Sequence, residues 1–268
     1  MYMALLLSVL VHGHRGARAM MPENTLPAFE YAIGAGADVL ELDLAVTKDD
    51  VLVVSHDPTL SRTICTGPGE GSPPIRTLTY EELQQWDCGA RRNPAFPKQT
   101  PMPGTRIPKL DQVLALATRG TFGFNIETKI FAEHPEYTPT PRRFAELLLE
   151  AIRRHGLEAR VIVQSFDFRT LHAMKELAPE IRLSALDERG KADFVAVARQ
   201  AGAPIVSPEK RLVTADKVRA AHEAGLQVVP WTANTPADWD RLVDAGVDAI
   251  ISDDPAELIA YLKKRGLR

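Results

Sequence analysis

The sequence predicts an α/β protein whose fold is a closed (β/α)8 TIM barrel. Eight apolar segments of strand length alternate with amphipathic helical patterns along most of the 268 residues. Four glycines directly follow helical stretches, where helices commonly end in a left-handed residue: Gly156, Gly202, Gly225 and Gly246. Barrels of this size commonly form one domain. We therefore expect residues 1–268 to be a single domain with its active site at the carboxyl ends of the strands.

The eight expected strands are rich in valine, isoleucine and leucine. Their ranges are 5–12, 39–46, 122–128, 160–166, 181–186, 204–207, 227–232 and 248–252. Helical patterns between them include residues 141–155, 168–177 and 214–224. An open, doubly wound sheet is the alternative architecture, but no G-x-G-x-x-G loop follows the first strand.

A ninth strand-like segment, residues 51–56, does not fit this alternation. The four residues 47–50 that precede it are too few for a parallel crossover but suit a β-hairpin after strand 2. If the turn centres on the two aspartates of this linker, antiparallel pairing brings His56 opposite Asp43. The hairpin is therefore predicted to deliver a histidine to an acidic pair.

Between residues 58 and 108 the alternation gives way to glycine, proline and polar residues, with a short helix expected at 80–86. Loops of this length are uncommon in compact domains and are usually functional or mobile. We expect this long insertion before strand 3 to lie over the barrel mouth as a lid or a substrate-specificity element. Its apolar content is too low to predict a core of its own.

Composition describes an ordinary globular protein and excludes several kinds of partner. The chain is 45% apolar and 25% charged, and its net charge of -3 offers no basic surface for nucleic acid. No apolar run is long enough to span a bilayer, so we expect no stable membrane insertion. Residues 3–11 are apolar, but no lysine or arginine precedes them, and we interpret them as a strand rather than a signal peptide.

Cys65 and Cys88 could pair, but two cysteines in a chain of this length do not make a disulfide framework. We therefore expect unpaired thiols, which are typical of a cytoplasmic protein. The oligomeric state is not predicted.

Four residues near the N-terminus have the clearest chemistry. His14 and Arg15 follow the first strand, and Glu41 and Asp43 lie in the second. Because Glu41 and Asp43 are two residues apart, their side chains share one face of a strand. Carboxylates this close repel unless a cation lies between them. A metal held by carboxylates, with His14 and His56 to move protons, is the equipment for cleaving a phosphate ester.

These residues belong to a longer series of motifs that resembles the glycerophosphodiester phosphodiesterase family over essentially the whole chain. In order, the motifs are His14-Arg15-Gly16 with Pro22-Glu23-Asn24-Thr25 and Phe29, Glu41-Leu42-Asp43 with residues 51–57, Asn125-Ile126-Glu127-Thr128-Lys129, Gln164-Ser165-Phe166, residues 221–226, Trp231-Thr232-Ala233-Asn234, and residues 246–255. One such motif is weak evidence, but this many in the family's order argue strongly against chance.

The resemblance implies a TIM-barrel hydrolase that uses a divalent cation to release glycerol phosphate and an alcohol from glycerophosphodiesters. It implies roles for seven residues: His14 and His56 as the general acid–base pair, Glu41, Asp43 and Glu127 as metal ligands, and Arg15 and Lys129 at the phosphate. All-oxygen ligands favour Mg²⁺ or Ca²⁺ over zinc. Two imidazoles that titrate near neutrality can exchange acid and base roles.

Other residues have a structural interpretation beside a functional one. Trp231 and Phe166 are expected to wall the substrate site, although either could belong to the core. His12 shares the face of His14 but lies outside the motif. A structural role is therefore favoured for it, and a supporting role in the site is the less favoured interpretation. Asp57 is expected to brace the hairpin.

Asn24 and Thr25 are expected mainly to cap the helix that begins near residue 26. An orientation of Glu23 toward the site is the minor alternative. Residues 252–254 are expected to begin the last helix.

Three questions of function stay open at this level. A lysophospholipase D or phospholipase C type activity on lipids is the enzymatic alternative, but the insertion has few large apolar residues, which favours a soluble small-molecule phosphodiester. A non-catalytic barrel that binds phosphorylated metabolites is the second alternative. Attack by the substrate's own hydroxyl, through a cyclic phosphate, is not distinguished from direct attack by water.

Overall fold

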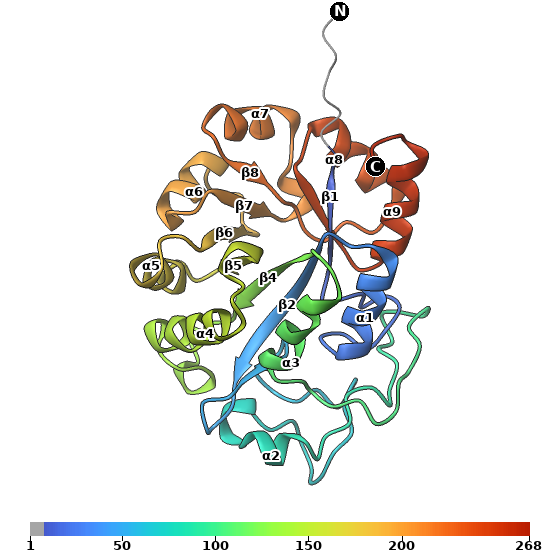
Figure 1. Cartoon of the computed structure of the whole chain (residues 1–268), viewed down its shortest axis with the longest axis vertical. Helices are drawn as coiled ribbons and strands as arrows, with labels where there is room; N and C mark the ends of the chain where they lie inside the picture. Colours follow the sequence, from blue (N-terminus) through green and yellow to red (C-terminus); the bar gives the residue numbers. More distant parts are fainter. Residues whose placement is uncertain (1–7) are drawn as a thin grey trace, which may run out of the picture.

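The computed structural model describes residues 8–268, and Figure 1 shows how their helices and strands are arranged. The strands are β1 (Leu10–Gly13), β2 (Val39–Val46), β3 (Leu52–Val54), β4 (Gly123–Thr128), β5 (Val161–Ser165), β6 (Arg182–Asp187), β7 (Ile205–Pro208), β8 (Gln227–Val228) and β9 (Ala249–Ser252). The α-helices are α1 (Leu26–Ala35), α2 (Tyr80–Leu83), α3 (Leu110–Leu114), α4 (Pro141–His155), α5 (Phe168–Leu177), α6 (Phe194–Ala201), α7 (Ala215–Glu223), α8 (Pro236–Ala245) and α9 (Pro255–Lys264). The start of the first expected strand, residues 5–7, lies outside the described residues, as does most of the segment 3–11 that we interpret as a strand.

Eight parallel strands form the predicted barrel, with helices packed around it (Figure 1). Their order is β8-β7-β6-β5-β4-β2-β1-β9. Backbone bonds join the two ends of this row, because Asp248 N donates to Val228 O (3.1 Å) and Ile251 N donates to Pro230 O (3.0 Å). The (β/α)8 class is therefore confirmed, and the open doubly wound sheet was the wrong alternative.

Helix α4 shows why the outer layer was predictable. Its N-terminal Pro141 suits the first helical position, and the Thr140 side chain accepts a hydrogen bond from Arg143 N (3.3 Å). Apolar side chains four residues apart, among them Phe144 and Leu148, are buried against the sheet. Gly156 then ends the helix in the left-handed conformation (φ 63°).

Strand β3 pairs antiparallel with β2, as the short linker predicted, but the register differs from the expected one. Ser55 N donates to Asp43 O (3.0 Å), so Ser55 rather than His56 lies opposite Asp43. The turn contains three residues, 48–50, and Asp50 adopts a left-handed conformation (φ 58°). The expected two-residue turn was wrong, and the additional turn residue shifts the pairing by one position.

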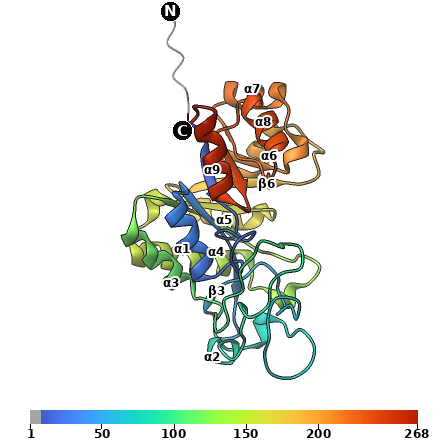
Figure 2. The ribbon, with the colours of Figure 1, turned by 90° about the vertical axis from the view of Figure 1, so that its right-hand side faces the viewer.

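The insertion, residues 58–108, lies at the end of the molecule far from α7, as Figure 2 shows by the position of α2. It has no core of its own among the described residues but contributes to a small apolar cluster that it shares with the hairpin. The buried members of this cluster are Ala45, Val53, Leu60, Cys65, Ile75, Leu83, Trp86, Cys88 and Ile107. Its apolar residues are thinly spread along the sequence, and their burial depends on contacts that no local pattern reports. The short helix expected at 80–86 is present as α2.

Cys65 and Cys88 form a disulfide (S–S 2.05 Å), so the expectation of unpaired thiols was wrong. Beside the bond, Thr66 and Asp87 exchange two backbone hydrogen bonds of 2.7 Å each, which bring the two segments together. Because disulfides persist mainly in oxidising compartments, the cysteines no longer support a cytoplasmic location. Among the described helices, none is long and apolar enough to cross a bilayer.

Candidate active site

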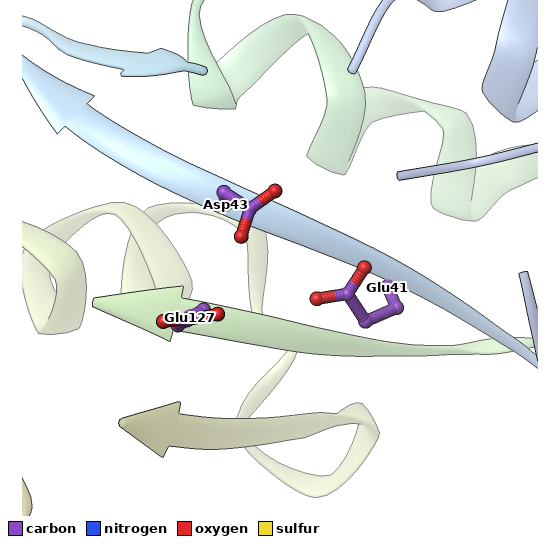
Figure 3. Close-up of side chains that lie close together, drawn as sticks. All are labelled: Glu41, Asp43 and Glu127. Atoms are coloured by element: carbon purple, nitrogen blue, oxygen red, sulfur yellow. The ribbon is translucent and has the colours of Figure 1, made fainter. Parts of the chain in front are cut away.

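Three carboxylates meet where the middle of β2 pairs with the carboxyl-terminal half of β4. These strands are parallel neighbours, and their register places Asp43 beside Glu127. Glu41, two residues before Asp43 on the same face of β2, points into the same space (Figure 3). One oxygen from each of the three carboxylates lies within 4.8 Å of the others, and all three side chains are buried.

The charges around these carboxylates are only partly balanced by side-chain cations. Lys129 Nζ lies 2.9 Å from Glu127 Oε1 and 3.3 Å from Asp43 Oδ1. Burial alone would raise the pKa of Asp43, but Lys129 and His56 outweigh it and hold that pKa well below its usual range.

Glu41 and Glu127 are less well compensated. Burial, together with the Asp43 charge, raises the pKa of Glu41 well above its usual range. Burial also raises the pKa of Glu127 to about 7, although Lys129 opposes the shift. These buried carboxylates carry more negative charge than the nearby cations neutralise, and their oxygens converge. A hard divalent cation prefers such oxygen ligands, so these residues fit a metal.

Neutral hydrogen bonds fix the orientation of the Glu41 carboxylate. Arg15 N donates to Oε2 (2.9 Å), and Gln164 Nε2 donates to Oε1 (2.8 Å). Asn125 Nδ2 in turn donates to Gln164 Oε1 (2.9 Å), and His12 Nδ1 lies 3.5 Å from the same nitrogen. His12 is therefore linked to the site through two amides. Burial lowers the pKa of His12 to about 4, which keeps the ring neutral at pH 7.

His14, at the end of β1, is held by a carboxylate that sequence reasoning missed. Its Nδ1 lies 2.5 Å from Asp253 Oδ1, and Asn234 Nδ2 donates to Asp253 Oδ2 (2.6 Å). The other ring nitrogen, Nε2, faces Glu41 at 4.0 Å. Asp253 was expected to begin a helix, but Asp254 caps α9 instead. The available clue was that Asp253 directly follows β9, the barrel neighbour of β1.

His56 is held by an aspartate in a similar way. Its Nδ1 lies 2.7 Å from Asp57 Oδ1, and its side chain is 34% exposed. The Asp57 side chain thus contacts the histidine rather than bracing the hairpin. The one-residue error in the hairpin register does not remove His56 from the site, because His56 lines the same cavity as the three carboxylates.

The loop between β1 and α1 contributes side chains to the site that the sequence predicted mainly as helix caps. Asn24 is left-handed (φ 57°), and its Nδ2 donates to Asp43 Oδ2 (2.9 Å). Thr25 occupies the N-cap position of α1, but no capping hydrogen bond comes from its side chain. The expected capping is thus met in position by Thr25, whereas the expectation was wrong for Asn24. Glu23 does not line the site cavity, but it accepts a hydrogen bond from Arg15 Nη1 (2.6 Å) and so contacts a residue that does.

All nine predicted site residues line one cavity of about 270 Å³. The lining residues are His14, Arg15, Arg18, Glu41, Asp43, His56, Glu127, Lys129, Gln164, Phe166, Leu186, Glu188, Trp231, Thr232 and Ile251. Arg18 and Glu188 were not predicted. Arg18 lies three residues after Arg15 in the same loop, and that proximity was the available signal.

Two aromatic side chains form one wall of this cavity. Phe166 and Trp231 meet edge to face with ring centroids 5.6 Å apart. Trp231 Nε1 donates to Ser207 O (2.9 Å), which anchors the indole, while Phe166 is 41% exposed.

Comparison with known proteins agrees with this geometry. The model of the glycerophosphoryl diester phosphodiesterase family matches residues 14–257. A glycerophosphodiester phosphodiesterase from Caldanaerobacter subterraneus subsp. tengcongensis is 34% identical over 261 residues, covering 97% of this chain and 100% of the relative. One from Bacillus altitudinis is 32% identical, covering 91% and 94%. A crystal structure from Silicibacter pomeroyi DSS-3 has a TM-score of 0.90 and 30% identity, covering 96% of this chain and 94% of that one.

The family match spans most of the chain and includes both histidine motifs and all three carboxylates. The non-catalytic barrel is therefore not retained. This chain belongs to the glycerophosphoryl diester phosphodiesterase family and is a phosphoric diester hydrolase.

Proposed function

We propose that the enzyme hydrolyses glycerophosphodiesters from deacylated phospholipids to glycerol phosphate and an alcohol. His14 and His56 are the general acid–base pair, and Glu41, Asp43 and Glu127 hold Mg²⁺ or Ca²⁺. The observation that supports this most is the single cavity in which two imidazoles, each fixed by an aspartate, flank three buried carboxylates.

The two histidines are arranged for proton transfer. In each ring a carboxylate binds Nδ1, which leaves Nε2 as the nitrogen that can exchange a proton with substrate. One imidazole accepts the proton of the attacking hydroxyl, and the other protonates the departing alkoxide. Fixed rings reduce the reorganisation that each transfer requires.

The cationic side chains stabilise negative charge on the phosphate. Arg15 and Lys129 line the cavity, and Asp43 and Glu127 raise the pKa of Lys129 although burial opposes them, so its ammonium stays charged. The bound cation would polarise the phosphoryl oxygens and lower the pKa of the attacking hydroxyl. The aromatic wall of Phe166 and Trp231 would contact the carbon atoms of the substrate.

A substrate screen with product identification tests this function. The enzyme is stripped of metal by exhaustive chelation and then given Mg²⁺, Ca²⁺ or Zn²⁺ separately with glycerophosphocholine, glycerophosphoethanolamine or lysophosphatidylcholine. Phosphorus NMR should show glycerol phosphate from the first two substrates with Mg²⁺ or Ca²⁺ and none after chelation. A transient five-membered cyclic phosphate would identify attack by the substrate's own hydroxyl.

Two outcomes would contradict the proposal. Full turnover after metal removal would exclude the carboxylate-bound cation. Lysophosphatidic acid released from lysophosphatidylcholine, with no reaction of the deacylated substrates, would favour the lysophospholipase D alternative.

A further inference from the structure

Residues 93–100 of the insertion form a segment that we call the strap. It packs against residues 14–25, the loop after β1 that carries His14 and Arg15. The two segments are more than 65 residues apart in sequence, since Asn93 and Glu23 are separated by 70 positions. The strap therefore joins the insertion directly to the loop that holds catalytic groups.

This loop has a backbone that needs support from outside. Arg15 (φ 50°) and Asn24 (φ 57°) are left-handed although both carry a Cβ atom, and Gly16 (φ 82°) lies beside Arg15. Side-chain-bearing residues disfavour this conformation, and it persists where surrounding contacts determine it. The barrel supplies one set of contacts, including the hydrogen bond from Gly16 N to Glu41 O (3.2 Å).

Gln99 supplies the opposing set of contacts. The side chain is 3% exposed, and its Nε2 donates to Arg18 O (2.8 Å) and to Met21 O (3.0 Å). Its Oε1 accepts from Asn93 N (2.8 Å), so one amide ties two loop carbonyls to the strap. Next to it, Thr100 N donates to the carbonyl of the intervening residue 20 (2.8 Å). Without Gln99, two partly buried loop carbonyls lose their protein partner, which is costly where water reaches them poorly.

The strap also contacts the arginines that line the cavity. The Phe96 ring lies 4.4 Å from the Arg18 guanidinium carbon. Asn93 Nδ2 lies 3.4 Å from Glu23 Oε2, and the other oxygen of that carboxylate binds Arg15. Both arginines thus have strap contacts, one directly and one through Glu23.

We propose that Gln99 is a positioning residue for the hydrolytic reaction. It holds the loop of residues 14–25 in the conformation that presents His14, Arg15 and Arg18 to the substrate, and so makes turnover depend on the insertion. This inference rests on the proposed function, because that function assigns His14 and Arg15 their roles.

Three variants test the proposal. Gln99→Ala removes the whole amide. Gln99→Glu preserves the size and the acceptor for Asn93 N but cannot donate to the two carbonyls. The matched control is Gln84→Ala, which makes the same change elsewhere in the insertion, where Gln84 Nε2 donates to Ile107 O (3.1 Å).

Both Gln99 variants should lower kcat/KM by roughly 10- to 100-fold, the range for a displacement of reacting groups by about 1 Å. The loss should appear in kcat as well as in KM, because the loop carries His14 as well as the arginines. Gln84→Ala should stay within about twofold of wild type. Rates are compared at a temperature where circular dichroism shows every variant folded.

Hydrogen exchange provides a readout that needs no substrate. The amides of residues 14–25 should exchange faster in both Gln99 variants than in wild type or Gln84→Ala. If Gln99→Ala does not fold, Gln99→Glu alone decides the question, because it keeps the side-chain size and the acceptor for Asn93 N.

The failures of the two proposals are distinguishable. A wild-type enzyme that hydrolyses no glycerophosphodiester contradicts the proposed function and leaves the exchange result to decide the role of Gln99. Kinetic constants and exchange rates equal to those of Gln84→Ala overturn the positioning role. Restoration of activity by Gln99→Glu would also overturn it, because side-chain volume would then be the relevant property.

Discussion

The carboxylates on β2 and β4 and the insertion between those strands are held in place by different kinds of contact. Glu41, Asp43 and Glu127 lie on hydrogen-bonded parallel strands, so the strand register sets their spacing. In the insertion, individual side chains hold the backbone. The guanidinium of Arg62 alone donates four hydrogen bonds to carbonyls, those of Gly67, Pro68, Gly69 and Gly71.

This enzyme therefore combines carboxylates placed by strand pairing with an insertion whose backbone is held by side chains. A strand ladder keeps its geometry when a side chain changes, because the ladder is made by backbone groups. A backbone held by side chains changes its local order when one of them is replaced. We therefore expect substitutions at the strand ends to change turnover before stability, and substitutions in the insertion to change local order first.

The largest effect is expected from the two histidines. His14→Ala and His56→Ala should each lower kcat by roughly 10² to 10⁴, the range for loss of a general acid or base. Steady-state kinetics on glycerophosphocholine measures the change, and His172→Ala, whose ring bonds Gln200 O on the outer surface, is the control. A rate within threefold of wild type for either site variant would refute its assignment. His56 directly follows the hairpin and precedes the insertion. Its variant therefore also tests whether a residue outside the strands affects turnover as strongly as one at a strand end.

A smaller effect is expected from the residue that orients His14. Asp253→Asn removes the anionic partner of Nδ1, and a loss of about 10- to 100-fold in kcat is the usual scale for such supporting groups. Burial lowers the pKa of His14 and Asp253 opposes that shift, so replacing Asp253 should lower the pKa of His14 further and move to lower pH whichever limb of the pH–rate profile reports His14. Asp254→Asn is a close control, because that neighbouring residue caps α9 instead.

An unchanged pH profile in Asp253→Asn, together with an unchanged kcat, would show that His14 needs no partner. Asp254→Asn should change stability by no more than about 1 kcal/mol, since asparagine is also a good N-cap, and should leave kcat unaltered.

The smallest effect on turnover is expected from the disulfide. Replacing Cys65 and Cys88 by serine opens a crosslink that spans 23 residues, worth about 3 kcal/mol by loop-closure entropy. The loss should appear as faster hydrogen exchange within residues 58–108, while kcat falls severalfold at most. A loss of turnover as large as that of His56→Ala would remove the distinction between the two regions.

Much of the barrel followed from local patterns. Helix α4 was predicted with its observed ends, because proline, periodic apolar residues and glycine mark its start, face and end within one segment. Strand β2 was predicted correctly because both of its faces are buried, so apolar residues fill it apart from the two acids. The predicted site residues share a cavity because strand ends of a parallel barrel meet at one rim.

Predictions failed where a side chain chooses a partner from a distant element. Asn24 is a residue type that commonly caps helices, yet its side-chain amide donates a hydrogen bond to Asp43 on β2. Asp253 was placed in a helix start because its neighbours suit one, yet it binds His14. In both cases the local environment allows two partners of similar chemistry, and the packing of separate elements selects one.

The barrel, the family and the residues that gather at the rim could be predicted from the chain alone, because strand periodicity, helix ends and short motifs are local properties. The hairpin register, the disulfide between Cys65 and Cys88, and the contact of Gln99 with the loop of residues 14–25 became evident only from the folded chain. These depend on distances between segments far apart in the chain, and such distances exist only once the barrel has closed and the insertion has packed against it.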